Sequence, residues 1–123
     1  MRITKNLSNF VPLSNIMAKI LLIDTSTEVC LVALSENNQV IASRIDTNGQ
    51  NHSKLIGTFV QDILQEVGMA AQALDAVALS AGPGSYTGLR IGTSFVKGLC
   101  FGVNIPVITL PTLQILAQDA LLQ

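Results

Sequence analysis

The chain has 123 residues, of which 49% are hydrophobic and only 12% are charged, and its formal net charge is −1. This length supports one domain with a real core and excludes two full domains. The near-neutral charge argues against independent binding of nucleic acid, which depends on many cationic contacts to phosphate. Since about a quarter of residues are usually charged, we expect part of the apolar surface to face a partner. No apolar stretch reaches the roughly 18 to 20 residues that span a bilayer.

The first sixteen residues lack the regular pattern that begins after Met17. They contain a short apolar patch around Phe10 but no small-residue cleavage pattern, which argues against a secretory signal. We interpret residues 1–16 as a leader or a mis-assigned start and expect them to be disordered. Residues 17–123 are then the folded domain.

Three strands are predicted next. Residues 19–24 (KILLID) are a continuous apolar run that ends in an acid, typical of a central strand buried on both faces. Residues 29–35 and 39–45 are two more strand candidates, and Asn37 and Asn38 between them tolerate the positive φ of a tight hairpin. The pattern predicts an antiparallel meander with Asp24 at a strand end.

Helices and strands then alternate. Apolar residues at three-to-four spacing predict an amphipathic helix over residues 51–67, with Asn51 as its cap and Gly68 just past its end. We then expect a strand at 75–80, a glycine-proline loop at 81–86, a helix at 87–102, a strand at 107–110 and a third helix from Pro111. The antiparallel opening distinguishes this order from a doubly wound sheet. It predicts an α/β fold of ribonuclease-H-like type, one half of an actin-like (ASKHA) ATPase, with a mixed five-stranded sheet and flanking helices.

The most distinctive segment is GPGSYTGLRIG at residues 82–92. Gly82 and Gly84 permit backbone conformations closed to other residues, and Ser85 or Thr87 can cap the helix that follows. Such a loop can hold an anion at a helix N-terminus. Its spacing matches neither the dinucleotide-binding fingerprint nor the P-loop, so a purely structural turn is the favoured interpretation.

A second polar segment, Asp24 to Thr27, follows the first predicted strand. It resembles the first phosphate loop of sugar kinases and Hsp70-like ATPases, where a carboxylate organises Mg²⁺ and hydroxyl or N–H groups meet phosphate. The alternative, which we favour, is a turn in which Asp24 and Thr27 bond the local backbone. The weak candidates for binding a nucleotide cofactor are Asp24, Thr25, Ser26, Gly84 and Ser85.

The residue types in the sequence do not favour a metal site or a catalytic mechanism. His52 is the only histidine, and no cysteine pair stands near it, whereas zinc or iron needs three or four ligands. Ser85 has no assignable base or orienting acid for a hydrolase mechanism. Cys30 and Cys100 lie in separate apolar runs and are predicted to be reduced core residues. We therefore expect no metal and no catalytic residue.

The motifs Ile23–Thr27 at a strand end, His52-Ser53 at a helix start and GPGSYTGLRIG occur in the order of the TsaB (YeaZ) family, which the chain resembles from Met17 onwards. The resemblance implies a cytoplasmic, non-catalytic subunit for the synthesis of threonylcarbamoyladenosine on tRNA. Its implied partners are the catalytic paralogue TsaD and the ATPase TsaE, with tRNA contacted only indirectly.

The same resemblance implies a second half that this sequence does not contain, so we expect no enclosed ATP site and no bound cofactor. A protease function has no support in these residues. The alternative function is a small kinase or ATPase of the actin-like superfamily that uses Asp24 and the GPGS loop.

Glycines in the second predicted helix recur four apart, at 88 and 92 and again at 98 and 102. A glycine inside a helix costs about 1 kcal/mol relative to alanine, which close approach of another backbone would offset. Either a partner helix approaches, as the family's interface implies, or the helix packs tightly on its own sheet. For an interface with TsaD or a second copy we expect Leu55, Phe59, Ile63, Gly88, Gly92, Thr93, Val96 and Leu99.

Overall fold

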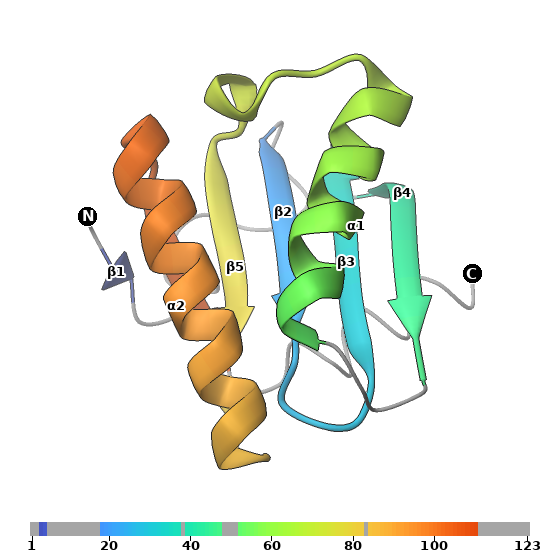
Figure 1. Cartoon of the computed structure of the whole chain (residues 1–123). Coiled ribbons are helices and arrows are strands. Elements are labelled where there is room, and N and C mark those ends of the chain that lie inside the picture. The colour runs from blue at the N-terminus through green and yellow to red at the C-terminus, as the bar shows by residue number, and fades with distance from the viewer. Residues whose placement is uncertain (1–2, 5–17, 38, 48–51, 83, 111–123) are drawn as a thin grey trace.

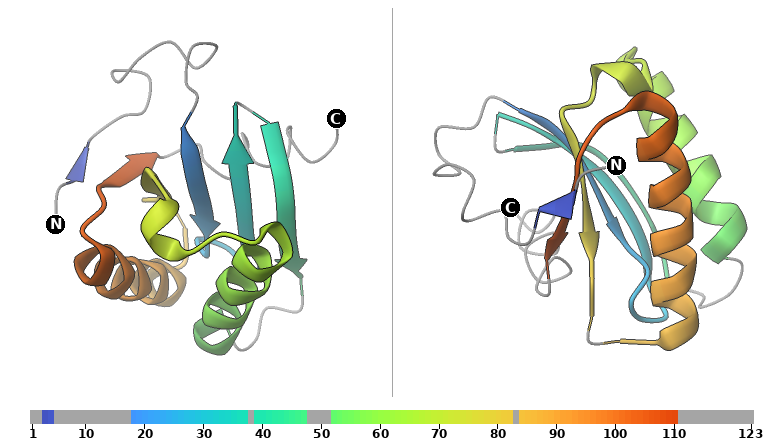
Figure 2. Two further views of the ribbon diagram at one scale, coloured as in Figure 1. Left: turned by 90° about the horizontal axis from the view of Figure 1, so that it is seen from above. Right: turned by 90° about the vertical axis from the view of Figure 1, so that its left-hand side faces the viewer.

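The computed structural model describes residues 3–4, 18–37, 39–47, 52–82 and 84–110. Over these residues a six-stranded sheet, in the order β1-β6-β5-β2-β3-β4, carries two α-helices on one face (Figures 1 and 2). The strands are β1 (Ile3–Thr4), β2 (Lys19–Asp24), β3 (Cys30–Glu36), β4 (Gln39–Asp46), β5 (Ala76–Ser80) and β6 (Val107–Leu110).

The predicted mixed sheet is confirmed. β2, β3 and β4 form the antiparallel meander, whereas β5 pairs in parallel with both β2 and β6. Asn37 adopts a φ of 55° at the turn between β3 and β4, as the hairpin required. One short strand was not predicted: Ile3 and Thr4 pair in parallel with Val107 and Ile108. The rest of the leader, the cap at residue 51 and the helix from residue 111 lie outside the described residues.

The two predicted helices are α1 (His52–Val67) and α2 (Tyr86–Val103), and a single 3₁₀ turn, η3 (Ala71–Ala73), follows α1. Gly68 takes a φ of 68° just past α1, which is the left-handed conformation that favours glycine. Ser85 caps α2 by accepting a hydrogen bond from the N–H of Gly88. Both helices therefore begin and end close to where the sequence predicted.

The main core lies between the helices and the sheet. β2 is buried on both faces, as its unbroken apolar run indicated: Leu21 and Ile23 face the helices, and Ile20 belongs to a smaller cluster on the opposite face. The helices contribute side chains at three-to-four spacing, so one stripe of each is buried. The helix residues in the main core are Ile56, Val60, Ile63, Val96 and Cys100.

Within the described part of the chain, no helix is both long and apolar enough to cross a membrane. This agrees with the hydropathy pattern, because polar residues interrupt both α1 and α2 on their outer sides.

Both cysteines are free thiols and fully buried, which confirms the prediction of reduced core residues. Burial raises the pKa of the Cys30 thiol to about 11, and the carboxylates of Asp46 and Asp24 add to the shift. Burial likewise raises the pKa of Cys100 to about 11. Only a thiolate attacks thiol reagents efficiently, so neither side chain is reactive near neutral pH.

We predict that the native protein leaves both thiols unmodified by Ellman's reagent at pH 8, and that two thiols react after unfolding in guanidinium. The raised pKa values mean that the folded state holds the protonated form until the pH approaches 11. Rapid reaction of either thiol in the native protein at pH 8 would contradict this packing.

Candidate functional site

The turn that follows β2 contains the polar segment singled out from the sequence. Asp24, Thr25 and Ser26 are 2%, 1% and 3% exposed, so their side chains are buried. Asp24 Oδ1 accepts hydrogen bonds from the Ser26 N–H at 2.9 Å and the Ser26 hydroxyl at 2.6 Å. Thr27 Oγ1 accepts from the N–H of Val29 at 3.1 Å. These bonds confirm the local-turn interpretation of this segment.

The first turn of α2 is bonded directly to this 24–27 turn. The Ser85 N–H donates to the carbonyl of Ser26 at 2.6 Å, and the Thr25 hydroxyl donates to the carbonyl of Gly88 at 2.7 Å. A Cβ atom at Gly84 would collide with the Ser26 carbonyl, and one at Gly88 with the Thr25 carbonyl. The glycines of the GPGSYTG segment therefore allow a helix start to rest on the turn.

Gly92, one helical turn further along, continues the same close packing. A Cβ atom there would lie 2.6 Å from Thr25 Oγ1 and 3.1 Å from Leu79 Cδ1. Gly98 and Gly102, in contrast, have open space where a Cβ atom would stand. Gly88 and Gly92 therefore pack within the chain itself, which is the second of the two alternatives given for them. Gly98 and Gly102 are open to solvent.

The first residue of α1 reaches the same turn. His52 Nε2 lies 3.0 Å from the carbonyl oxygen of Thr27, and because a carbonyl only accepts, Nε2 carries the proton. The side chain is 9% exposed, and its Nδ1 has no hydrogen-bond partner within the described residues. Among the described residues, Asp24 Oδ2 is the other buried side-chain atom without a hydrogen-bond partner.

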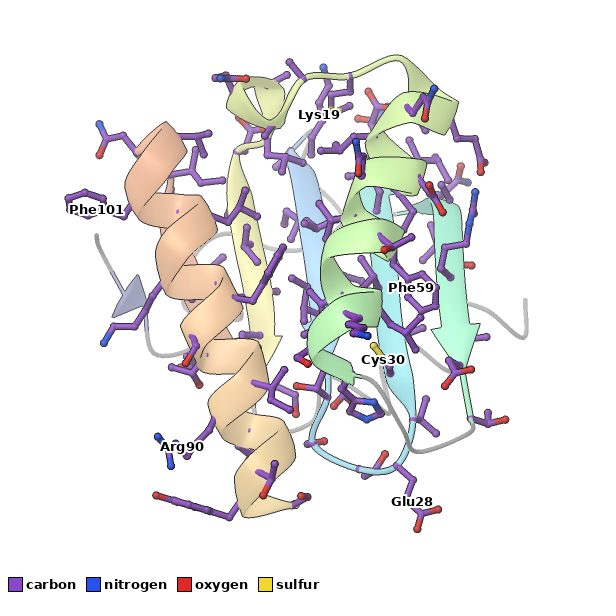
Figure 3. The ribbon with its side chains drawn as sticks, in the orientation of Figure 1. Lys19, Glu28, Cys30, Phe59, Arg90 and Phe101 are labelled. Atoms are coloured by element: carbon purple, nitrogen blue, oxygen red, sulfur yellow. The ribbon has the colours of Figure 1, made fainter. Side chains whose placement is uncertain are left out.

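An open hollow of about 590 Å³ lies over the turn and between the two helix starts. Of the sequence candidates, Ser26, Gly84 and Ser85 line it, whereas Asp24 and Thr25 do not. Glu28, which the sequence analysis did not single out, adds an exposed carboxylate at the turn (Figure 3). The described residues hold no group of three His, Cys, Asp or Glu side chains that could bind a metal ion.

Comparison with known proteins places this geometry in a family. Residues 26–123 match the family model described as TsaD, tRNA N6-adenosine threonylcarbamoyltransferase. The chain is 40% identical over 102 residues to the tRNA threonylcarbamoyladenosine biosynthesis protein TsaB of Escherichia coli, covering 83% of this chain and 44% of that protein. Identity to TsaB of Bacillus subtilis is 39% over 100 residues, covering 81% and 44%.

The chain belongs to the TsaD family, on its TsaB (YeaZ) branch. The structure of YeaZ from Pseudomonas aeruginosa superimposes with a TM-score of 0.76 at 39% identity and covers 87% of this chain and 50% of that one. A Bacteroides thetaiotaomicron protein with an actin-like ATPase fold superimposes at 13% identity with a TM-score of 0.53, covering 89% and 39%. That likeness supports the predicted ribonuclease-H-like fold. The chain spans about half the length of the relatives it matches.

Four of the eight residues expected at an interface are buried in this structure. Gly88 and Gly92 are buried against the 24–27 turn, and Ile63 and Val96 are buried in the core at 0% and 1% exposure. Ile63 and Val96 therefore present almost no surface to a partner, whereas Gly88 also lines the open hollow. Helical periodicity alone does not show which apolar face meets the sheet, which is why both alternatives for the glycines were open.

The remaining four do not share one surface. Leu55 and Phe59 are half-buried and pack against the core, and Figure 3 places Phe59 on the side of α1 that faces β3 and β4. Thr93 is exposed on the flank of α2 that faces β5 and β6, beside Leu79 and Thr109. Leu99 is half-buried against the core.

A different surface lies between the helices. Gly57 and Phe95 bring α1 and α2 together, since a Cβ atom at Gly57 would lie 3.9 Å from Phe95 Cε2. A groove of about 560 Å³ over this contact, the inter-helix groove, is lined by Ser53, Tyr86, Thr87, Arg90, Ile91, Ser94 and Phe95.

Two aromatic rings of α2 stand in solvent, Tyr86 at the wall of this groove and Phe101 near the other end of the helix. Tyr86 and Phe101 are 74% and 79% exposed, and the Arg90 guanidinium lies 5.6 Å from the Tyr86 ring centroid. Arg90 and Phe101 extend from α2 on the side away from α1 (Figure 3). The exposed Phe101 was detectable from sequence, because it is an aromatic residue opposite the apolar stripe of its helix.

We predict opposite effects of the same substitution at two glycines of α2. Gly88→Ala should lower the free energy of unfolding by about 3 kcal/mol, because its Cβ atom collides with the Thr25 carbonyl. Gly98→Ala, the matched control, has open space and should raise it by about 1 kcal/mol. Urea denaturation of both variants measures the difference, and equal effects would contradict the packing of α2 on the turn.

We also predict that Asp24 serves the turn through its hydrogen bonds rather than its charge. Asp24→Ala should cost about 2 kcal/mol of stability because it leaves the buried Ser26 N–H without an acceptor, whereas Asp24→Asn keeps an oxygen and should cost less than about 1 kcal/mol. ATP hydrolysis measured on the same samples tests the kinase alternative, which gains support if the wild type hydrolyses ATP and both variants do not.

Proposed function

We propose that this chain is part of a non-catalytic scaffold subunit in the synthesis of threonylcarbamoyladenosine on tRNA. The names of its TsaB relatives and its match to the TsaD family model support the link to threonylcarbamoyladenosine synthesis. The observation that carries the proposal is that the 24–27 turn and the glycine loop are bonded to each other, while the two-helix layer carries an open groove.

A non-catalytic role fits the chemistry of the site. Asp24 and Thr25 are buried, their hydrogen bonds join the turn to itself and to α2, and neither side chain lines the hollow above. A metal-assisted transfer needs a cation held by several ligands with an open position for substrate. We therefore assign bond breaking to another subunit and expect no ATP bound by this chain alone.

The proposed docking face is the outer surface of α1 and α2 around the inter-helix groove. It combines a depression with the exposed ring of Tyr86 and the guanidinium of Arg90. Aromatic and arginine side chains are enriched among the residues that dominate binding energy at protein interfaces. Ser53 and Ser94 leave room for side chains of a partner helix.

The proposed partner is a TsaD-type catalytic paralogue, with which this chain shares its family model. A TsaE-type ATPase would join the same assembly, and tRNA would be contacted only through other subunits because the net charge of −1 provides no basic surface. A second copy of this chain is the competing occupant of the same face. We place the assembly in the cytoplasm.

We predict that Ser94→Arg weakens binding to the TsaD-type paralogue at least about tenfold, since a long cation would fill the groove beside Arg90. The matched control is Gln72→Arg, which adds the same side chain at an exposed site in η3, away from the groove. Affinity is measured by titration calorimetry, and the stoichiometry by size exclusion with light scattering.

Equal binding by both variants would reject the groove as the docking site. Failure of the unmodified chain to bind the paralogue, while circular dichroism shows it folded, would reject the scaffold role for this chain. A wild-type dimer that Ser94→Arg dissociates would instead assign the groove to self-association.

A further inference from the structure

The 24–27 turn joins the starts of two helices that lie far apart in the sequence. Each of three consecutive residues is bonded to a helix start: the Thr25 hydroxyl donates to the Gly88 carbonyl, the Ser26 carbonyl accepts from the Ser85 N–H, and the Thr27 carbonyl accepts from His52 Nε2. Two of these bonds hold α2 and the third holds α1. The turn is thus a common anchor for both helices.

His52 provides the α1 side of this connection. It is the first residue of α1, is 9% exposed, and donates across 25 positions of sequence to the turn. At the other end of α1 the ion pair between Arg44 and Glu66 is partly exposed, at 34% and 47%, and such pairs contribute little. Between its ends α1 packs on the core through Ile56, Val60 and Ile63, and His52 adds a directed hydrogen bond at its start.

The position of His52 bears directly on the inter-helix groove. Ser53, the next residue, lines that groove, and Thr87 lines both the groove and the hollow that His52 borders. A displacement of the α1 start relative to the α2 start would therefore change the spacing of the groove walls at Ser53 and Thr87.

We propose that His52 is a positioning residue that couples the start of α1 to the start of α2 through the Thr27 carbonyl and so sets the geometry of the inter-helix groove. The part of this inference that concerns partner binding rests on the proposed function. The coupling itself is a property of the chain alone and has its own measurement.

The test compares His52→Ala, His52→Gln and the control Lys54→Ala. The glutamine amide can donate to the Thr27 carbonyl as Nε2 does, and Lys54 is an exposed residue in the same helical turn that does not line the groove. Hydrogen exchange is followed at the N–H groups of Ser85, Gly88 and Leu89, which are bonded at the α2 start. We expect exchange about tenfold faster in His52→Ala and near the wild-type rate in His52→Gln and Lys54→Ala.

Affinity for the TsaD-type paralogue is measured on the same proteins. We expect His52→Ala to bind about tenfold more weakly and His52→Gln to bind as the wild type does. If His52→Ala does not fold, the same measurements compare His52→Gln with His52→Leu, which keeps the bulk of the side chain and removes the donor.

Unchanged exchange at the α2 start in His52→Ala would overturn the coupling, whatever the partner does. So would a uniform acceleration across β2, β3 and both helices, because that pattern reports a loss of global stability only. Local acceleration with unchanged affinity would overturn the link to the groove. If the wild type itself does not bind, the scaffold proposal fails, while the exchange rates still decide the coupling.

Discussion

The contact between the 24–27 turn and the glycine face of α2 is the constraint on which the rest of this structure depends. The Thr25 and Ser26 carbonyls lie where Cβ atoms of Gly88 and Gly84 would stand, so only a helix and preceding loop without side chains at these positions can rest there. The Thr25 hydroxyl and the Ser85 N–H then fix its angle and register. Because α2 packs beside α1, this contact also places the inter-helix groove.

The same contact explains how polar groups at a strand end are used. In open α/β sheets the carboxyl ends of strands are the usual ligand-binding edge, and this turn lies at the end of β2. Here, however, the Asp24 carboxylate and the Thr25 hydroxyl are buried and bonded to the chain itself. A loop with the residue types of a phosphate site therefore acts as an internal support. This use favours a scaffold over a kinase.

A low charge content and an exposed helix layer are consistent with each other. Charged residues make up 12% of the chain, and two of its five aromatic rings, Tyr86 and Phe101, project into solvent from a single helix. The other large hydrophobic side chains exposed among the described residues are Ile41 and Ile45 of β4. Tyr86, which lines the inter-helix groove, is the ring that the proposed docking face would cover.

The sequence by itself determined the order of the elements, the antiparallel opening of the sheet and the burial of β2 on both faces. These follow from local signals: unbroken apolar runs, three-to-four spacing in helices, Asn37 and Gly68 at positive φ, and Ser85 as a cap. The motif order also identified the family, because a segment as long as GPGSYTGLRIG seldom matches a family's motif by chance.

Only the tertiary structure decided what each helix face contacts. Periodicity groups Gly88, Gly92 and Val96 on one stripe but does not show whether that stripe meets the sheet or a partner. The structure places the stripe on the 24–27 turn and the core, and it leaves Ser94 and Phe101 outside. The hydrogen bond from His52 to Thr27 was equally hidden, because no local pattern specifies a contact between residues 25 positions apart.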